Sequence, residues 1–182
     1  KTLTLTRDDG LPGNEFQEVN LGVSKDGRIW VATITGAASF HPEALTTNRR
    51  RPPVYVTALK QDGAPMPLAE TPESTRRIEL DWRQNDFEFE FAALNFTRAD
   101  KNRYRYQLEG FDRGWFDSGE RRFGRYANLP GGDYVLRVQA ANNDGIWSDK
   151  EARLEVHVKA PFWHAAWFRG LMATLALLAL LA

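Results

Sequence analysis

Hydrophobic and polar residues alternate along much of the chain between residues 54 and 159, and this alternation predicts β-strands. Residues 152–159 show it most clearly, with apolar side chains on one face and polar side chains on the other. The strands expected from the pattern cover residues 54–60, 76–80, 86–94, 103–110, 122–129, 133–142 and 152–159. About seven strands in about a hundred residues, without long helices, predict an all-β, immunoglobulin or fibronectin III-like sandwich over residues 54–159.

The first 45 residues consist of shorter alternating segments, beginning with residues 1–6, and frequent turn residues such as the Asp26-Gly27 pair of a tight hairpin. They predict about four short strands in about forty residues, the size of one β-propeller blade. A blade packs both faces against its neighbours, so we expect residues 1–45 to be a terminal blade fragment. Two hairpins belonging to the sandwich are the alternative. Residues 46–53, polar, basic and ending in two prolines, form the expected linker.

Residues 160–182 differ from the rest of the chain. The stretch 170–182 has no charged side chain, and Phe162, Trp163, Trp167 and Phe168 precede it. Such rings gather at membrane–water interfaces. A helix over 170–182 reaches only about 20 Å, against about 30 Å for the hydrocarbon layer. The segment therefore predicts an aromatic belt followed by the beginning of a transmembrane helix. A buried C-terminal helix of a soluble domain is the alternative.

Composition excludes several functional classes. Lys plus Arg and Asp plus Glu both number 24, so the formal net charge is zero and the basic signature of nucleic-acid binding is absent. The chain contains no cysteine, which excludes disulfides, thiol catalysis and cysteine-based zinc sites. With 42% hydrophobic and 12% aromatic residues, the chain has the composition of an ordinary folded protein.

Candidate catalytic groups are few and dispersed. His41, His157 and His164 have neither the spacing of metal ligands nor that of a catalytic triad. Glu88 and Glu90 fall on the same face of an expected strand, about 7 Å apart, a separation that some glycosidases use. Two glutamates on the polar face of an amphipathic strand are far more often solvated. We therefore expect no catalytic site, no metal and no cofactor, and conclude that this segment is not an enzyme.

Two groups of residues carry resemblances to known families. The first resembles the repeats of the two-component-regulator propeller family, which read Asp-Gly-Leu-Pro and then Asp-Gly-x-x-Trp-x-x-Thr. The residues that occupy these places are Asp9, Gly10, Leu11, Pro12, Asp26, Gly27, Trp30 and Thr33. The Gly-Leu pair that usually follows is degenerate, as Gly36-Ala37, which suits a terminal blade.

The second group resembles the three-Y domain of two-component regulators over roughly residues 53–159. That pattern reads Tyr-x-Tyr-x-Leu-x-Gly-Phe-Asp-x-x-Trp, then Tyr before Asn-Leu-Pro, then Gly-Asp-Tyr, and ends Asn-x-x-Gly-x-Trp. Gly131 replaces a second proline of the family pattern, a change expected only to loosen the turn. The residues for which we expect a structural role in this motif are Tyr106, Gly110, Trp115, Tyr126, Leu129, Pro130, Tyr134, Gly145 and Trp147.

Sugar binding is the main alternative role for the aromatic residues, because indole rings stack on pyranose faces. Trp82, Trp115 and Trp147 are the candidates for such stacking. A loop containing Arg121, Arg122 and Arg125 is a weaker candidate for binding an acidic sugar or a partner chain. The family tyrosines, in contrast, stand where sandwich cores and a tyrosine corner require them. The ligand-binding residues are thus unknown from the sequence.

The resemblance implies the membrane-proximal periplasmic region of a bacterial sensor histidine kinase, in a single- or two-pass protein of the inner membrane. It further implies a homodimer formed through the sandwich and the membrane helix, a small-molecule or oligosaccharide ligand on the rest of the propeller, and a cytoplasmic kinase. The connection from residue 159 to the helix is short, which favours mechanical coupling between them. The alternative function is a membrane-tethered extracellular carbohydrate-binding or adhesion module.

Overall fold

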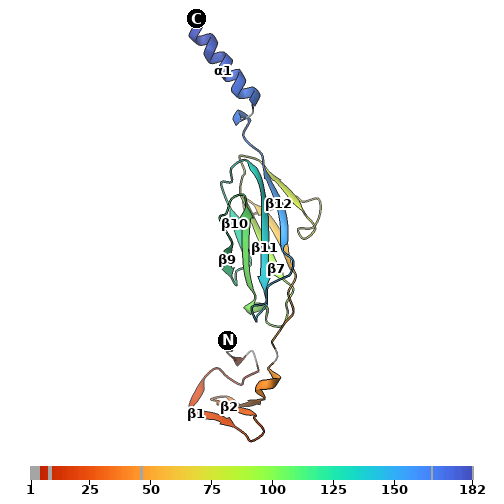
Figure 1. Ribbon diagram of the computed structural model, residues 1–182, viewed down its shortest axis with the longest axis vertical. Helices are drawn as coiled ribbons and strands as arrows, with labels where there is room; N and C mark the ends of the chain where they lie inside the picture. Colours follow the sequence, from red (N-terminus) through yellow and green to blue (C-terminus); the bar gives the residue numbers. More distant parts are fainter. Residues whose placement is uncertain (1–4, 8–9, 46, 165, 182) are drawn as a thin grey trace. The chain divides into compact units, whose positions relative to one another are not determined.

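The computed structural model describes residues 5–7, 10–45, 47–164 and 166–181 (Figure 1). The chain divides into two compact units between Thr47 and Asn48. The first unit contains one small sheet, and the second contains a β-sandwich followed by helix α1 (Ala166–Leu181).

The N-terminal unit contains an antiparallel sheet in the order β1-β2-β3, followed by a short 3-10 turn. The strands are β1 (Phe16–Val23), β2 (Ile29–Thr33) and β3 (Gly36–Phe40), and the turn is η2 (Pro42–Ala44). Gly27 has a φ of +80° in the first hairpin, the conformation for which glycine is favoured there. Leu21, Val23 and Trp30 are largely exposed within this unit, as in a sheet that lacks neighbouring blades.

The expected strand over residues 1–6 falls largely outside the described residues. Residues 1–4 lie outside the described part of the chain, and Leu5 and Thr6 are not in a strand. The described part of the unit thus contains three strands where four were expected. The blade assignment stays a prediction.

The second unit is a sandwich of two sheets. The first sheet has the order β10-β7-β4-β5, and the second has the order β6-β12-β11-β8-β9. Neighbouring strands are antiparallel except for β6 and β12, which are parallel. The strands are β4 (Val54–Gln61), β5 (Ala64–Pro65), β6 (Arg77–Leu80), β7 (Phe87–Ala93), β8 (Arg103–Glu109), β9 (Phe116–Gly119), β10 (Phe123–Tyr126), β11 (Gly132–Ala141) and β12 (Ala152–Val158).

The core lies between the two sheets and follows the alternation in the sequence. Phe87, Phe89 and Phe91 of β7 are essentially inaccessible to solvent. They pack with Leu136 of β11 and Leu154 of β12 in one continuous cluster. Because successive residues of a strand point to opposite faces, the residues between these positions face outward. The predicted sandwich is confirmed.

Two short strands, β5 and β9, lie outside the ranges predicted from the sequence. The sequence of β9, Phe-Asp-Ser-Gly, has no alternation, and it pairs with β8 through an irregular register between Tyr104 and Arg105. Pairing with an existing edge, rather than a local pattern, makes this segment a strand. Strand β9 forms one edge of the five-stranded sheet.

A short connection joins β12 to α1. It contains the 3-10 turn η4 (Phe162–His164) and the aromatic residues expected there. Within the ranges that the structure describes, no helix combines the length and hydropathy needed to cross a membrane.

Candidate functional site

Tyr134 forms the hydrogen bond expected of a tyrosine corner. Its hydroxyl donates to the carbonyl oxygen of Pro130 at 2.9 Å, and Leu129 beside it is buried. Gly110 lies against the ring: a Cβ at this position would be 3.1 Å from Cδ1 of Tyr134, and its φ is +91°. The corner therefore requires glycine at position 110, and burial raises the pKa of Tyr134.

Tyr126 and Tyr106 are also bound within the sandwich. The Tyr126 hydroxyl donates to the Asp112 carboxylate, which also accepts the backbone N–H of Leu108 at 2.7 Å. Burial, followed by the hydrogen bond to Asp112, raises the pKa of Tyr126 far above its usual range. The Tyr106 ring meets Phe89 edge-on with centroids 5.2 Å apart. The three family tyrosines thus hold turns in place and pack in the core of the sandwich.

The structure brings together two of the three candidate sugar-stacking tryptophans. The guanidinium of Arg105 lies 4.9 Å from the Trp115 ring centre and 4.3 Å from that of Trp147. Gln139 holds this guanidinium by accepting from Nε at 2.8 Å and from Nη2 at 2.6 Å. Cation–π contacts of this kind stabilise the arrangement. A ring face that Arg105 covers is closed to a sugar.

Trp82 lies apart from this pair. It contacts Trp163, with ring centroids 4.6 Å apart and planes at 76°, and Arg83 lies 4.8 Å over its ring. Gly145, the remaining turn residue of the family motif, has a φ of +80° and donates its N–H to Asn142. The nine motif residues therefore lie in the tyrosine corner, in the core, in turns and, for Trp115 and Trp147, against Arg105.

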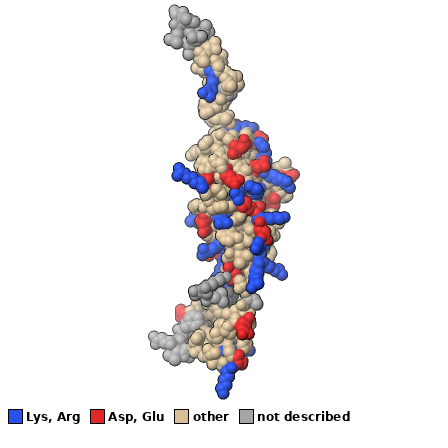
Figure 2. All heavy atoms as spheres, in the orientation of Figure 1, with Lys and Arg blue, Asp and Glu red and all other residues tan. Residues whose placement is uncertain are grey.

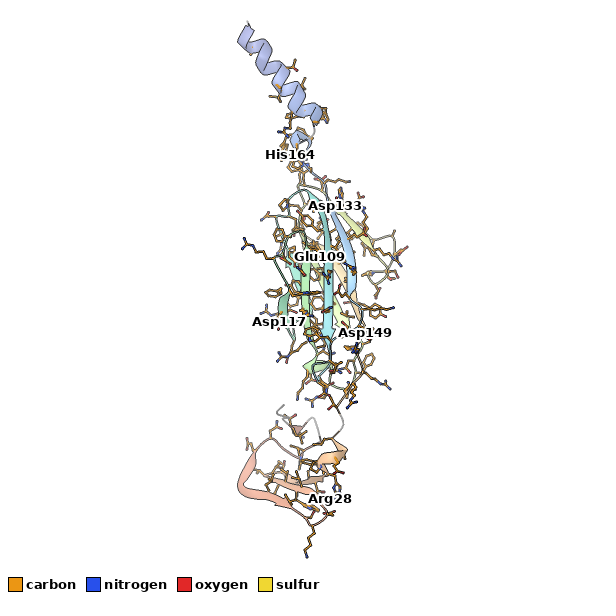
Figure 3. The ribbon with its side chains drawn as sticks, in the orientation of Figure 1. Arg28, Glu109, Asp117, Asp133, Asp149 and His164 are labelled. Carbon is orange, nitrogen blue, oxygen red and sulfur yellow. The ribbon has the colours of Figure 1, made fainter. Side chains whose placement is uncertain are left out.

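The outer face of the five-stranded sheet has a network of ion pairs around Arg137. Its Nε and Nη2 each donate to Glu151 at 2.7 Å, and its Nη1 donates to Glu109, which is labelled in Figure 3. Gln139 donates to Glu151 at 2.8 Å, which connects the network to Arg105. Basic and acidic side chains are interspersed over the sandwich surface (Figure 2). Hydrogen bonds from Arg137 lower the pKa of Glu151. The carboxylates of Glu151 and Glu109, in turn, raise the pKa of Arg137.

Replacing Glu151 by glutamine should destabilise the sandwich by about 1 kcal/mol at neutral pH, because a charged, two-point hydrogen bond is lost. The folded-state pKa of Glu151 lies below its ordinary 4.5. Its stabilising effect is therefore fully present above that pH and is lost as the pH falls through the folded-state pKa. Urea unfolding of both proteins across the acid range should show the stability difference shrinking towards low pH. A difference that stays constant with pH would contradict this assignment.

The remaining candidate charges are paired separately. Glu90 binds Lys60 at 2.5 Å, and Glu88 lies 3.5 Å from Arg125, which also binds Asp86 at 3.1 Å. Nearby cations thus engage both candidate glutamates.

The other basic residues and the histidines do not assemble into a site. Arg122 donates to the carbonyl of Ala99 at 2.9 Å, and Arg121 is exposed at the turn between β9 and β10. His157 binds Asp133 at 2.7 Å, whereas His41 belongs to the N-terminal unit and His164 to η4. In the described ranges, no group of three His, Asp or Glu side chains is placed to hold a metal ion.

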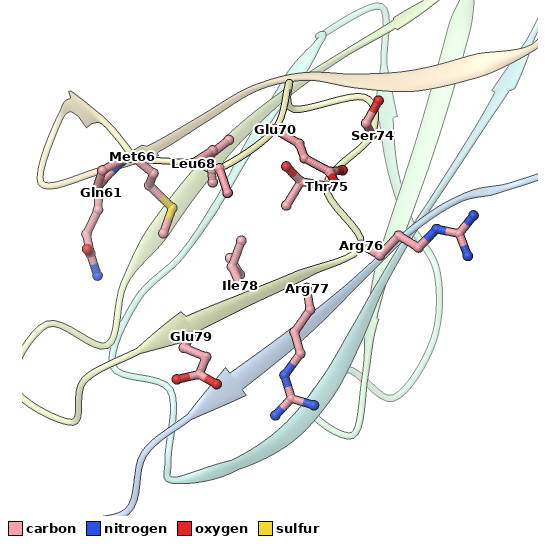
Figure 4. A pocket seen from close by; sticks show the side chains of 12 residues that line it. Gln61, Met66, Leu68, Glu70, Ser74, Thr75, Arg76, Arg77, Ile78 and Glu79 are labelled. Atoms are coloured by element: carbon pink, nitrogen blue, oxygen red, sulfur yellow. The ribbon is translucent and has the colours of Figure 1, made fainter.

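Two hollows flank the loop before β6. One, of about 590 Å³, has an apolar lining of Met66, Leu68 and Ile78, while Arg76 and Arg77 point away from it (Figure 4). The other, of about 690 Å³, lies between the same loop and strands β4 and β12. The lining of the first hollow also includes the polar side chains of Gln61, Glu70 and Thr75.

Asn142, at the end of β11, holds the chain where it enters the sandwich. Its Nδ2 donates to the carbonyl oxygens of Asn48 at 2.6 Å and Arg50 at 2.8 Å. Its Oδ1 accepts from the N–H groups of Asp144 at 2.9 Å and Ile146 at 3.0 Å. The side chain is buried, and both of its polar atoms are engaged. We call this set of contacts the entry clasp.

Further asparagines extend the entry clasp. Asn48 donates to Asn95 at 3.1 Å, and Asn95 donates to Asn102 at 2.7 Å. The backbone N–H of Asn48 also donates to Asp144 at 2.7 Å. The hydrophobic pattern does not predict this cluster, and its local signal in the sequence is the Asn-Asn pair at positions 142 and 143.

At the other end of β11, a second set of contacts holds the chain that leaves the sandwich. A Cβ on Gly131 would lie 2.8 Å from Cα of Ala160, and the N–H of Lys159 donates to Leu80 at 2.9 Å. Trp82 contacts Trp163 just beyond. We call these contacts the exit clasp. They correct the expectation that Gly131 only loosens its turn, because any side chain there, proline included, would displace Ala160.

The Y_Y_Y domain family model matches residues 95–159. The chain is 26% identical to Histidine kinase P4 of Formosa agariphila over 166 residues, which cover 87% of this chain and 12% of that protein. The extracellular domain of the hybrid two component system BT3049 from B. thetaiotaomicron superposes with a TM-score of 0.68 at 25% identity, covering 84% of this chain and 21% of that chain. The extracellular domain of BT4673 from the same organism gives a TM-score of 0.56 at 25% identity, covering 78% and 20%.

The chain therefore spans only a small part of the relatives it matches. The tyrosine corner, the Tyr126–Asp112 bond and the Gly110 contact all lie inside the matched residues. Residues 95–159 thus match the Y_Y_Y domain family, and the chain is similar in sequence and in fold to the extracellular domains of two-component systems.

Proposed function

We propose that this chain is the membrane-proximal, periplasmic part of a two-component sensor, and that its sandwich relays a ligand-dependent change to the segment that leads into α1. The similarity to extracellular domains of two-component systems supports the location. In this proposal the ligand, a small molecule or an oligosaccharide, binds the propeller to which residues 1–45 contribute. The output is a cytoplasmic histidine kinase, and the receptor is a homodimer through the sandwich and the membrane helix.

The observation that carries the proposal is the pair of clasps on β11. This strand has ten residues and is about 33 Å long at about 3.3 Å per residue. The entry clasp lies just after its last residue, and the exit clasp lies just before its first. The incoming and outgoing chains are thus bound to opposite ends of one hydrogen-bonded strand.

A strand in the centre of a sheet deforms little, because both of its edges are paired. Strand β12 pairs with residues 132–138 of β11 and strand β8 with residues 135–141, so the two neighbours together cover the whole strand. A displacement at the entry clasp should therefore move the exit clasp as well, whereas a flexible linker would absorb it.

Inserting a flexible Gly/Ser spacer after Lys159 should uncouple the two ends. Full-length protein in membrane vesicles would be incubated with labelled ATP, with and without a mixture of soluble oligosaccharides, and phosphohistidine measured. We expect the oligosaccharides to change the label on the parent protein but not on the spacer variant. The same spacer placed after Gly63, in the exposed β4–β5 turn, is the matched control and should respond like the parent.

Two results would reject the proposal. A spacer variant that responds like the parent would show that the exit clasp is not part of the signalling route. A full-length protein that takes no phosphate on histidine would exclude the kinase output and favour a tethered binding module.

A further inference from the structure

We infer that the end of the sandwich next to α1 is a membrane-contact surface, formed by the loops of residues 81–86 and 110–115. Its occupant is the headgroup layer of a bilayer that contains anionic phospholipid. The inference rests on the proposed function, because it requires that α1 lead into the membrane. It adds that the sandwich itself touches the lipid, in addition to the segment that connects it to α1.

The first loop, residues 81–86, connects β6 to β7. Trp82 contacts Trp163, and Arg83 stacks over the Trp82 ring. Trp163 precedes α1 by only a few residues, so Trp82 must lie close to the depth at which α1 begins. Indole rings favour the membrane interface, since their apolar body and polar N–H suit the boundary between hydrocarbon and water.

The second loop, residues 110–115, connects β8 to β9 and presents Phe111 and Arg113. Phe111 is 47% exposed, although it meets Tyr126 and Tyr134 edge-on. Gly110 packs against Tyr134, whose strand begins at the exit clasp, so this loop lies at the same end of the sandwich as Trp82. Each loop thus supplies an exposed arginine close to an aromatic ring, Trp82 in the first loop and Phe111 in the second.

The carboxylates at this end have partners within the sandwich, which leaves two arginines to meet an external anion. Asp112 is held by Tyr126 and the N–H of Leu108, and Asp133 binds His157. Asp81 accepts the backbone N–H of Arg83 at 3.0 Å, and Glu79 lies 3.4 Å from Lys159. Arg83 and Arg113, in contrast, are exposed, and neither forms an ion pair with the described residues. Phospholipid phosphates are suitable partners for such arginines.

The aromatic surface continues into the connection to α1. Phe162, Trp163 and Trp167 are 50%, 40% and 64% exposed. The Trp82–Trp163 contact makes the first loop continuous with this apolar segment. Asp133 and His164 both lie at this end, and Asp149 lies towards the other (Figure 3).

The test uses full-length protein in nanodiscs of phosphatidylethanolamine and phosphatidylglycerol. An environment-sensitive dye is attached to a cysteine introduced as Gln84→Cys, and spin-labelled lipids serve as the quencher. Thr174→Cys in α1 reports on the proposed function, and Lys150→Cys, exposed before β12, is the matched control at the opposite end. The 182 residues contain no cysteine, and the parent protein labelled in the same way gives the background from the rest of the polypeptide.

We expect the dye at positions 84 and 174 to lose emission to lipid quenching and the dye at 150 to remain unchanged. Quenching at 174 without quenching at 84 would overturn the inference and leave the proposed function standing. A blue-shifted but unquenched dye at 84 would likewise overturn it, because protein would then cover the loop. A lack of quenching at both positions would reject the membrane placement of α1 and the inference with it.

The role of Arg83 is tested by adding Arg83→Gln to the Gln84→Cys protein, a change that keeps Trp82. We expect weaker quenching at 84, as when phosphatidylglycerol is replaced by phosphatidylcholine, while quenching at 174 stays the same. Equal quenching with and without the arginine, or with and without the anionic lipid, would overturn the assignment to anionic headgroups.

Discussion

Replacing Phe89 by alanine is expected to lower the free energy of unfolding of the sandwich by about 3–5 kcal/mol. The side chain is completely buried at the centre of β7. Its ring lies 5.2–5.9 Å, centroid to centroid, from the rings of Phe87, Phe91, Tyr106 and Tyr126. Alanine would remove those contacts and leave a cavity among rings too large to close it. Urea unfolding followed by circular dichroism measures the loss.

Gly124 on the neighbouring strand provides a double-mutant test of this packing. A Cβ at position 124 would be 2.5 Å from Cζ of Phe89 and 2.9 Å from Cζ of Tyr106. Gly124→Ala alone should therefore cost about 1–3 kcal/mol through overpacking. In the Phe89→Ala background the same change should cost less, because the closer ring is gone.

The two changes are thus expected to be non-additive by about 0.5–3 kcal/mol. Phe123→Ala is the matched control, because that ring lies next to Gly124 in the sequence but is 61% exposed. Its effect should stay within about 0.5 kcal/mol. Strictly additive effects of the Phe89 and Gly124 changes would contradict the packing described for β7 and β10.

The sandwich could be predicted from sequence because its central strands carry a local signal. In β7 and β12 every second residue is apolar. In a two-layer fold, such a strand buries its apolar side chains only when that face points towards the other sheet. Strand β9 carries no such signal, and its formation depends on pairing with β8. The parallel pairing of β6 with β12 joins segments far apart in the sequence, so alternation cannot reveal it.

The candidate site was less predictable, because its contacts are long-range. Trp115 and Trp147 qualified as sugar platforms by residue type, but only the fold places Arg105 between them. The entry clasp joins Asn142 to residues more than ninety positions earlier. The sequence around Gly131 is that of an ordinary turn. Only the fold shows that a side chain at this position would collide with Ala160.

Asn142→Ala is expected to lower the free energy of unfolding by about 3 kcal/mol, since four backbone groups lose a buried partner. Asn143→Ala is the matched control, because Asn143 is its sequence neighbour but only half buried. It should cost clearly less. Equal losses from the two variants in urea unfolding would show that the entry clasp does not depend on Asn142.

Asn142→Asp separates the two halves of the entry clasp. It keeps oxygen acceptors for the N–H groups of Asp144 and Ile146, but removes the donor that holds Asn48 and Arg50. Amide hydrogen exchange should therefore accelerate at residues 48–51 and stay slow in β11. If the sandwich relays a displacement from one end of β11 to the other, the oligosaccharide-dependent change in phosphohistidine should disappear in this variant although the fold persists. A response that survives the release of residues 48–51 would separate the entry clasp from signalling and leave it a purely structural attachment.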